Sequence, residues 1–64
     1  MKYYRLNDNE NNGKIVRAEG RIHEIYEDGK WIRDTIMLRY FSDESPYYGC
    51  YEEVSKPVAM RSLT

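Results

Sequence analysis

The sequence predicts one small α+β domain over residues 1–64. The expected architecture is a twisted antiparallel sheet of four or five strands, with one or two short helices that cover one face. Three observations predict it: short segments of alternating apolar and polar residues, turn-forming residues between them, and a helix-start signal near the C-terminus. A compact SH3-like or OB-like barrel is the alternative, because short antiparallel strands also build small barrels.

Two strands are expected at residues 2–6 and 14–19. In the first strand Tyr4 and Leu6 share one face, because side chains alternate along a strand. The intervening residues 7–13 have no apolar side chain and consist of Asn, Asp, Glu and Gly. Asn, Asp and Gly favour turns and accept left-handed backbone. The two strands are therefore predicted to be antiparallel neighbours joined by a loop.

Gly20 and an Asp-Gly pair at 28–29 punctuate the next stretch. A glycine within a strand pattern often marks a bulge or a bend, which is the expectation for Gly20. Residues 21–27 carry apolar side chains at a spacing that fits either a strand or a short helix. The Asp-Gly pair decides for a strand, because Asp-Gly between two alternating segments is the strongest short hairpin signal.

The turn at 28–29 also fixes which residues of the hairpin face each other, because a two-residue loop sets the register. Each predicted pair joins opposite or potentially opposite charges, two aromatic rings or two isoleucines. The pairs are Glu27 with Lys30, Tyr26 with Trp31, Ile25 with Ile32, Glu24 with Arg33, and His23 with Asp34.

Residues 35–41 fit two structures. Ile36, Leu38 and Tyr40 alternate, as in a strand. Ile36 and Tyr40 are also an i,i+4 pair, and Asp34 is a good N-cap. A short helix is the prediction for this segment and a strand is the alternative.

The C-terminal third is predicted to run turn, strand, helix. Residues 42–49 are turn-forming, and residues 50–54 fit a last strand. Ser55 is a candidate N-cap for a short helix over 56–63. Pro57 is tolerated in the first turn of that helix, where its missing N–H has no partner to lose.

Charge, length and the single cysteine exclude several classes of protein. The net charge is −1, from 10 basic and 11 acidic residues that are mixed along the chain, so long-range attraction of nucleic acid or anionic lipid is not expected. No apolar run approaches the ~20 residues of a membrane span, and the N-terminus lacks the apolar stretch of a signal peptide. Cys50 has no partner for an internal disulfide, and a lone thiol is typical of a reducing cytosol. A cytoplasmic protein without membrane contact is the expectation.

The core must depend on aromatic residues. Val, Ile, Leu and Phe together number only twelve, whereas the chain has seven Tyr in addition to Trp31 and Phe41. A domain of this size buries only about 60% of the surface of its unfolded chain. Its stability is therefore marginal, which favours a homodimer.

The motifs at 28–31, 40–41 and 51–55 resemble those of a group of short uncharacterised bacterial proteins. That group carries a DGKW-type hairpin, a Tyr/Phe pair and a strand ending in an IS- or VS-type helix start, and this chain reads Asp-Gly-Lys-Trp, Tyr-Phe and Tyr-Glu-Glu-Val-Ser. The resemblance covers about the last 40 residues. The chain departs from it at 56–58, where Lys-Pro-Val stands in place of acidic residues. The resemblance implies a stand-alone bacterial cytosolic protein, and no activity is attached to the group.

Catalytic, metal-binding and cofactor-binding residues are not expected. His23 and Cys50 are too few for a multi-ligand zinc site, and a structural place opposite Asp34 accounts for the histidine. Thiol chemistry would need a pocket that a domain this small rarely encloses. Glu52 and Glu53 are strand neighbours that point to opposite faces, and the glycines match no phosphate-binding motif. The chain is therefore not expected to be an enzyme.

The aromatic residues are the candidate binding residues. Tyr47 and Tyr48 lie in the proline-containing loop. Tyr51 follows closely, and Trp31 lies next to the hairpin turn. Because Tyr and Trp dominate binding hot spots, we predict that these four anchor a protein-interaction module. The module docks through an aromatic surface or through an edge strand that adds a partner strand, and the partner is another protein or a second copy of the chain. The structural alternative is that the rings cover the core and only their hydroxyls reach water.

Binding of single-stranded nucleic acid is the alternative function, because arginines and aromatic rings on one face can hold stacked bases. The hairpin register places Tyr26, Trp31 and Arg33 on one face. Glu24 shares that face and would repel phosphate. Nucleic acid is therefore the less favoured partner.

Overall fold

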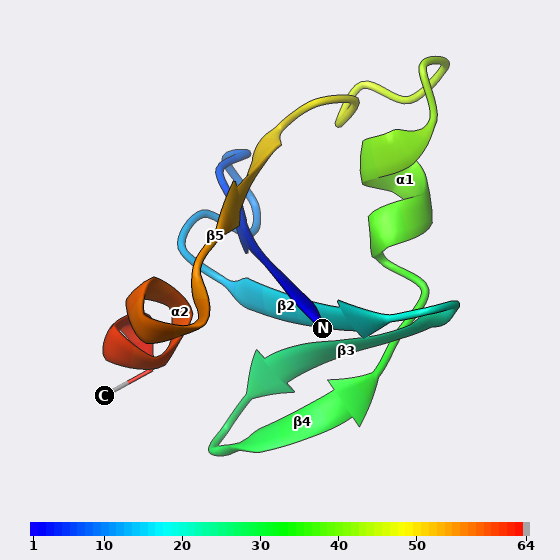
Figure 1. Cartoon of the computed structure of the whole chain (residues 1–64). Helices are drawn as coiled ribbons and strands as arrows, with labels where there is room; N and C mark the ends of the chain where they lie inside the picture. Colours follow the sequence, from blue (N-terminus) through cyan, green and yellow to red (C-terminus); the bar gives the residue numbers. More distant parts are fainter. Residues whose placement is uncertain (64) are drawn as a thin grey trace.

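The computed structural model describes residues 1–63 and has the predicted α+β fold. A five-stranded antiparallel sheet carries two short helices (Figure 1). In chain order the elements are β1 (Lys2–Leu6), β2 (Ile15–Glu19), β3 (Ile22–Glu27), β4 (Lys30–Arg33), α1 (Met37–Phe41), β5 (Tyr51–Val54) and α2 (Lys56–Ser62).

The sheet is open. Its strand order is β4-β3-β2-β1-β5, so the chain crosses from the β4 edge to the far side of β1, where β5 pairs antiparallel with β1. A barrel requires its first and last strands to pair, whereas β4 and β5 are the two edges of this sheet. The barrel alternative is therefore wrong.

The β3–β4 hairpin has the predicted register. Its paired residues are Glu24 with Arg33, Ile25 with Ile32, Tyr26 with Trp31 and Glu27 with Lys30. The Asp34 N–H donates to the His23 carbonyl oxygen at 3.0 Å, which continues the pattern by one predicted pair. Asp28 and Gly29 have φ values of 50° and 82°, the left-handed conformation that a two-residue I′ turn requires.

Gly20 differs from its predicted role. It does not bulge a strand but begins a second two-residue hairpin turn, in which Glu19 pairs with Ile22 and Gly20 and Arg21 form the loop. Gly20 has a φ of 60°, which suits the first position of a II′ turn. Gly-Arg is a weaker hairpin signal than Asp-Gly, which is why the sequence pattern resembled an interruption.

The helix predicted near residues 35–41 is present as α1, but its predicted N-cap is wrong. α1 begins at Met37 with Ile36 in the N-cap position, and no side chain caps it. Asp34 still belongs to the hairpin, where its N–H donates to His23, and it lies two residues before the N-cap position. The chain therefore leaves the sheet two residues later than the capping pattern indicated.

α2 begins as predicted. The Ser55 hydroxyl accepts a hydrogen bond from the Val58 N–H at 3.4 Å, and Pro57 lies in the first turn. The helix ends at Ser62, one residue before the predicted end.

α1 and α2 cover opposite faces of the sheet, whereas the sequence predicted that helices cover one face. On β1, Tyr4 packs in the cluster under α1, while its neighbour Tyr3 packs with Ala59 of α2. Neighbouring strand residues point to opposite faces, so adjacent apolar residues on the central strands require cover on both sides. The α1 cluster comprises Tyr4, Leu6, Val16, Ala18, Ile25, Met37 and Tyr40, and the α2 cluster comprises Tyr3, Ile15 and Ala59.

A buried polar contact ties α1 to the loop between β1 and β2. The Tyr40 hydroxyl donates to Oδ1 of Asp8 at 2.5 Å and accepts from Nδ2 of Asn11 at 3.0 Å. Burial acts to raise the pKa of Asp8, but the hydrogen bonds from Tyr40 and from backbone N–H groups outweigh it and hold that pKa below its usual value. Asp8 therefore stays charged although it is buried, because its oxygens have donors.

Candidate functional site

Three of the four predicted anchors lie near α1. Tyr47 and Tyr51 are half-buried against the α1 cluster, with ring centroids 5.7 and 6.5 Å from that of Tyr40. The Tyr47 hydroxyl donates to Glu10 at 2.6 Å, and this hydrogen bond is the main cause that raises the pKa of Tyr47. Tyr48 is 57% exposed, so of these three tyrosines it has the side chain most accessible to a partner. Tyr47 and Tyr51 are thus mainly cover for the core.

Trp31, the fourth predicted anchor, lies on the opposite face of the sheet. Its indole is half-buried against the α2 cluster, with the rings of Tyr26 and Tyr3 at 5.1 and 6.5 Å. The Arg17 guanidinium lies 4.2 Å from the indole centroid. The structure therefore does not bring the four predicted residues together on one surface.

A different set of apolar side chains lies around the β2–β3 turn, at one end of the sheet. Six large apolar side chains are exposed in the described part of the chain. Four of them line two grooves beside the β2–β3 turn, and both grooves include His23. We call this set the turn-end surface; it comprises Met1, Ile22, His23, Leu38 and Phe41.

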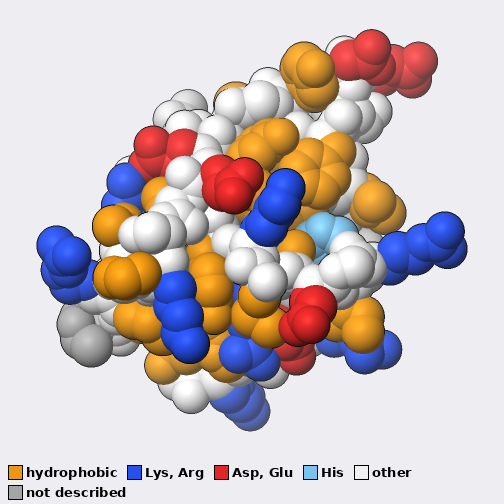
Figure 2. Space-filling model, in the orientation of Figure 1, with side chains coloured by type: hydrophobic (Ala, Val, Ile, Leu, Met, Phe, Trp, Pro, Cys, Tyr) orange, Lys and Arg blue, Asp and Glu red, His pale blue; other side chains and the backbone are white. Residues whose placement is uncertain are grey.

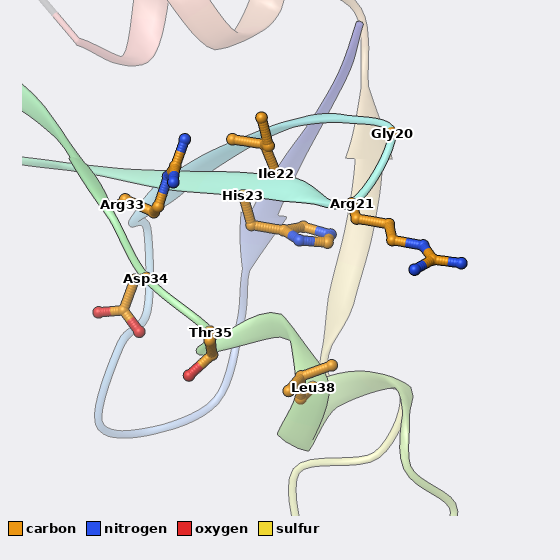
Figure 3. Close-up of a pocket in the computed structure, with 8 residues that line it drawn as sticks. All are labelled: Gly20, Arg21, Ile22, His23, Arg33, Asp34, Thr35 and Leu38. Carbon is orange, nitrogen blue, oxygen red and sulfur yellow. The ribbon is translucent and has the colours of Figure 1, made fainter.

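The first groove separates β3 from α1. It has a volume of about 400 Å³ and lies at the end of the sheet, where Leu38 of α1 and Ile22 of β3 both border it, Ile22 from the opposite face of β3 to His23. Figure 3 shows the His23 ring between these two side chains, with Arg21 and Asp34 extending to either side. The groove thus has an apolar floor with charged groups at its rim.

The second groove adjoins the first at Gly20 and His23. It has a volume of about 440 Å³ and includes Met1 and Phe41. In Figure 2 the single histidine lies beside apolar side chains on the molecular surface. The two grooves therefore share lining residues at the β2–β3 turn.

Phe41 is held in place from several sides. Its ring centroid lies 5.4 Å from Tyr51, 5.9 Å from Tyr4 and 6.0 Å from His23, in each case edge to face. Such edge-to-face pairs add stability beyond their buried area. Tyr51 therefore contributes to the turn-end surface from below, as support for Phe41.

The turn-end surface was not among the sequence predictions, because its members come from three separate segments. One signal was available in α1: of its five residues only Arg39 is charged, while Met37, Leu38 and Phe41 are apolar. A helix with apolar residues all round cannot bury them all against one sheet face. Met37 and Tyr40 point into the core, which leaves Leu38 and Phe41 exposed.

The residues considered for catalysis do not form a metal-binding group. Within residues 1–63 no cluster of three or more His, Cys, Asp or Glu side chains is placed to hold a metal ion. His23 packs edge to face with Phe41, and Cys50 is a half-buried free thiol at the margin of the α1 cluster. The described helices are too short to span a membrane.

Comparison of the chain with models of protein families, with curated proteins and with solved structures finds no match.

Proposed function

We propose that this chain is a non-enzymatic protein-interaction module that binds a partner protein through the turn-end surface. The observation that supports it is the gathering of Met1, Ile22, Leu38 and Phe41 around His23. Contiguous exposed apolar side chains on a small protein mark sites of association, because their burial removes apolar surface from water. A cytoplasmic location is part of the proposal, since the only cysteine is a free thiol.

The chemistry of the grooves defines the partner. The groove that Ile22 and Leu38 help to line is large enough for an apolar side chain such as leucine or phenylalanine. Arg21 and Arg33 stand at the same groove with one carboxylate, Asp34. The partner is therefore a peptide segment with an apolar anchor flanked by acidic residues, whose carboxylates face the Arg21 guanidinium.

Selection from a random peptide library tests this proposal, because it lets the surface choose its own ligand. Immobilised wild-type protein is used to enrich binders from a phage-displayed library, and the dissociation constants of synthesised binders are measured by fluorescence polarisation. Enriched peptides are expected to share an apolar anchor with neighbouring Asp or Glu. No enrichment over an uncoated surface would contradict the proposal.

A matched pair of variants locates the binding. Leu38 and Tyr48 are both large, exposed and apolar, at 63% and 57% exposure, but only Leu38 belongs to the turn-end surface. Leu38→Lys is expected to weaken peptide binding by about tenfold or more, and Tyr48→Lys by less than about threefold. The reverse order would exclude the turn-end surface and favour the tyrosine loop.

Binding of single-stranded nucleic acid has weaker support. Arg17, the arginine nearest Trp31, pairs with Glu24 at 2.7 Å, and Arg5 pairs with Glu52. These carboxylates reduce the charge that would attract phosphate. The Arg17 guanidinium also occupies a face of the indole on which a base would stack.

A further inference from the structure

The outer edge of β4 has backbone N–H and C=O groups that are available to pair with another strand. Hydrogen-bonded and non-hydrogen-bonded pairs alternate along an antiparallel ladder. Because Asp34 is hydrogen-bonded to His23, Asp34 and Ile32 turn their peptide groups towards β3. Trp31 and Arg33 consequently turn theirs outward, away from the sheet. Figure 1 shows β4 as the outermost strand, with no helix drawn along its free side.

Geometry limits how two copies of β4 can pair with each other. In an antiparallel ladder outward-facing residues pair only with outward-facing residues. A two-fold axis between two copies must therefore pass through a residue that faces its own copy. Within the outer part of β4 the possible centres are Trp31, Ile32 and Arg33.

Charge distinguishes the three centres. An axis at Arg33 sets two guanidinium groups directly opposite each other, which is destabilising. An axis at Trp31 sets Lys30 opposite Ile32 and forms no ion pair. An axis at Ile32 sets Lys30 of one copy opposite Asp34 of the other. It also sets Trp31 of one copy opposite Arg33 of the other, and both of these residues have peptide groups that point away from β3. Of the three registers, only the one centred on Ile32 both pairs opposite charges and lets the outward-pointing peptide groups of Trp31 and Arg33 form hydrogen bonds.

We propose that two copies of this chain associate by antiparallel pairing of β4 with β4, with Ile32 facing Ile32 on the two-fold axis. In each Trp31–Arg33 pair the two residues exchange both backbone hydrogen bonds. Their side chains lie on the same face, where the guanidinium reaches the indole. The Lys30–Asp34 pairs add opposite charges, and the two sheets become one continuous sheet.

The other edge of the sheet, β5, is acidic and therefore less suited to self-pairing than β4. β5 carries Glu52 and Glu53, and self-pairing centred on either residue would set two carboxylates opposite each other. Pairing of β4 with β5 of a next copy would instead build an open-ended sheet. The two-fold pairing occupies the β4 edge of both copies and leaves only the acidic β5 edges free.

Disulfide trapping tests the register. In a non-hydrogen-bonded pair the Cα atoms are about 4.5 Å apart, which is within disulfide range. In a Cys50→Ser background, Ile32→Cys is therefore expected to give a dimer that resists denaturing electrophoresis until reductant is added. Arg33→Cys is the control, because its thiol lies away from its own copy. No trapped dimer from Ile32→Cys, or equal trapping from Arg33→Cys, would overturn the proposal.

Charge exchange tests the ion pairs. Asp34→Lys sets two lysines opposite each other in each pair and is expected to weaken the dimer by about tenfold or more in sedimentation equilibrium. Adding Lys30→Asp restores the attraction and is expected to recover most of the loss. If the double variant does not fold, as judged by circular dichroism, the disulfide result decides.

The oligomeric state of the wild-type chain, measured by sedimentation equilibrium, tests the proposal independently of the variants. A reversible monomer–dimer equilibrium over a concentration series is expected. A monomer at every concentration would overturn the proposal. Assemblies larger than a dimer would also overturn it if Glu53→Lys abolished them, since this would indicate β4–β5 pairing. The self-association surface goes beyond the proposed function. Leu38→Lys is expected to keep the dimer while losing peptide binding, so the two proposals fail separately.

Discussion

The Tyr40 hydroxyl connects α1 with the loop between β1 and β2. It bonds both Asp8 and Asn11, and its ring is completely buried. We predict that Tyr40→Phe lowers the free energy of unfolding by about 1–3 kcal/mol, because the buried Asp8 carboxylate loses a donor. Urea denaturation followed by circular dichroism measures the loss. A variant as stable as the wild type would show that water replaces the hydroxyl at no cost.

The same residue predicts a dependence on alkaline pH. Burial, aided by the hydrogen bond to Asp8, raises the pKa of Tyr40 to about 12. Tyrosine in the unfolded chain titrates near pH 10. As the pH rises the unfolded state loses its proton first, so the stability associated with Tyr40 is full below about pH 10 and is lost towards about pH 12.

Tyr40→Phe isolates this contribution from that of the other tyrosines. Between about pH 9 and 11.5 the unfolding free energy of the wild type should fall more steeply than that of the variant. The measurement is a series of urea denaturation curves across this range. Parallel pH profiles for the two proteins would contradict the expectation.

Trp31 tests the weaker of the two functional alternatives. Arg17 covers one face of the indole and pairs with Glu24. Titration of the protein with short single-stranded oligonucleotides should therefore leave the Trp31 fluorescence unchanged at both low and high salt. Quenching at low salt that disappears at high salt would instead indicate phosphate contacts.

At the residue scale the sequence did not predict the contact between Tyr40 and Asp8. The two residues are 32 positions apart, and neither belongs to a local motif that joins them. His23 was placed correctly opposite Asp34, because the hairpin register is a local property. Its ring contact with Phe41 depends on where α1 lies and has no local signal.

At the scale of elements, local turn chemistry decided what was predictable. The register of β3 and β4 followed from Asp28 and Gly29, because only a left-handed two-residue turn closes this hairpin. The start of α2 followed from Ser55, whose hydroxyl caps the helix. Both signals lie within a few residues of the structure that they specify.

Gly29 offers the direct test of that turn. Its φ of 82° lies in the region that L side chains rarely adopt. Gly29→Ala is therefore expected to lower the unfolding free energy by about 1 kcal/mol or more, although an added Cβ meets no atom within 4 Å. Asp28→Asn is the matched control and should be neutral, since Asn accepts the I′ turn at least as well as Asp. Equal stability of both variants, measured by thermal denaturation, would mean that the turn tolerates a different backbone.

The elements that the sequence misassigned depend on contacts distant along the chain. Asp is a residue type that favours the N-cap position, but Asp34 stays paired with His23 of β3 and the helix begins only at Met37. Glycine within a strand pattern often marks a bulge or a bend, but the pairing of β2 with β3 places Gly20 in a hairpin turn. The two helices lie on opposite faces because adjacent apolar residues of β1 and β2 point to both faces, but which helix covers which face depends on the tertiary fold.

At the scale of the whole molecule, aromatic rings replace aliphatic side chains in the core. The Cα radius of gyration is 11.0 Å, close to the about 10.7 Å expected for a compact chain of this length. Tyr3, Tyr4 and Tyr40 are each buried, two of them on one face of the sheet and one on the other. The low aliphatic content is thus compatible with a compact fold.

The same property made the binding site difficult to predict. Tyr and Trp are typical of both binding surfaces and cores, and composition alone does not separate the two. In this fold Tyr47 and Tyr51 mainly cover the core, whereas the exposed apolar surface is formed by Leu38, Phe41 and Ile22. These three come from two elements that meet only through the tertiary fold.

Chemical-shift mapping tests the turn-end surface most directly. A selected peptide is titrated into ¹⁵N-labelled wild-type protein, and the backbone amide shifts are followed residue by residue. We predict that the largest changes fall on Ile22, His23 and Leu38, with small changes at Tyr48. Changes centred on the tyrosine loop or on the α2 face, with Ile22 and Leu38 unmoved, would contradict the account.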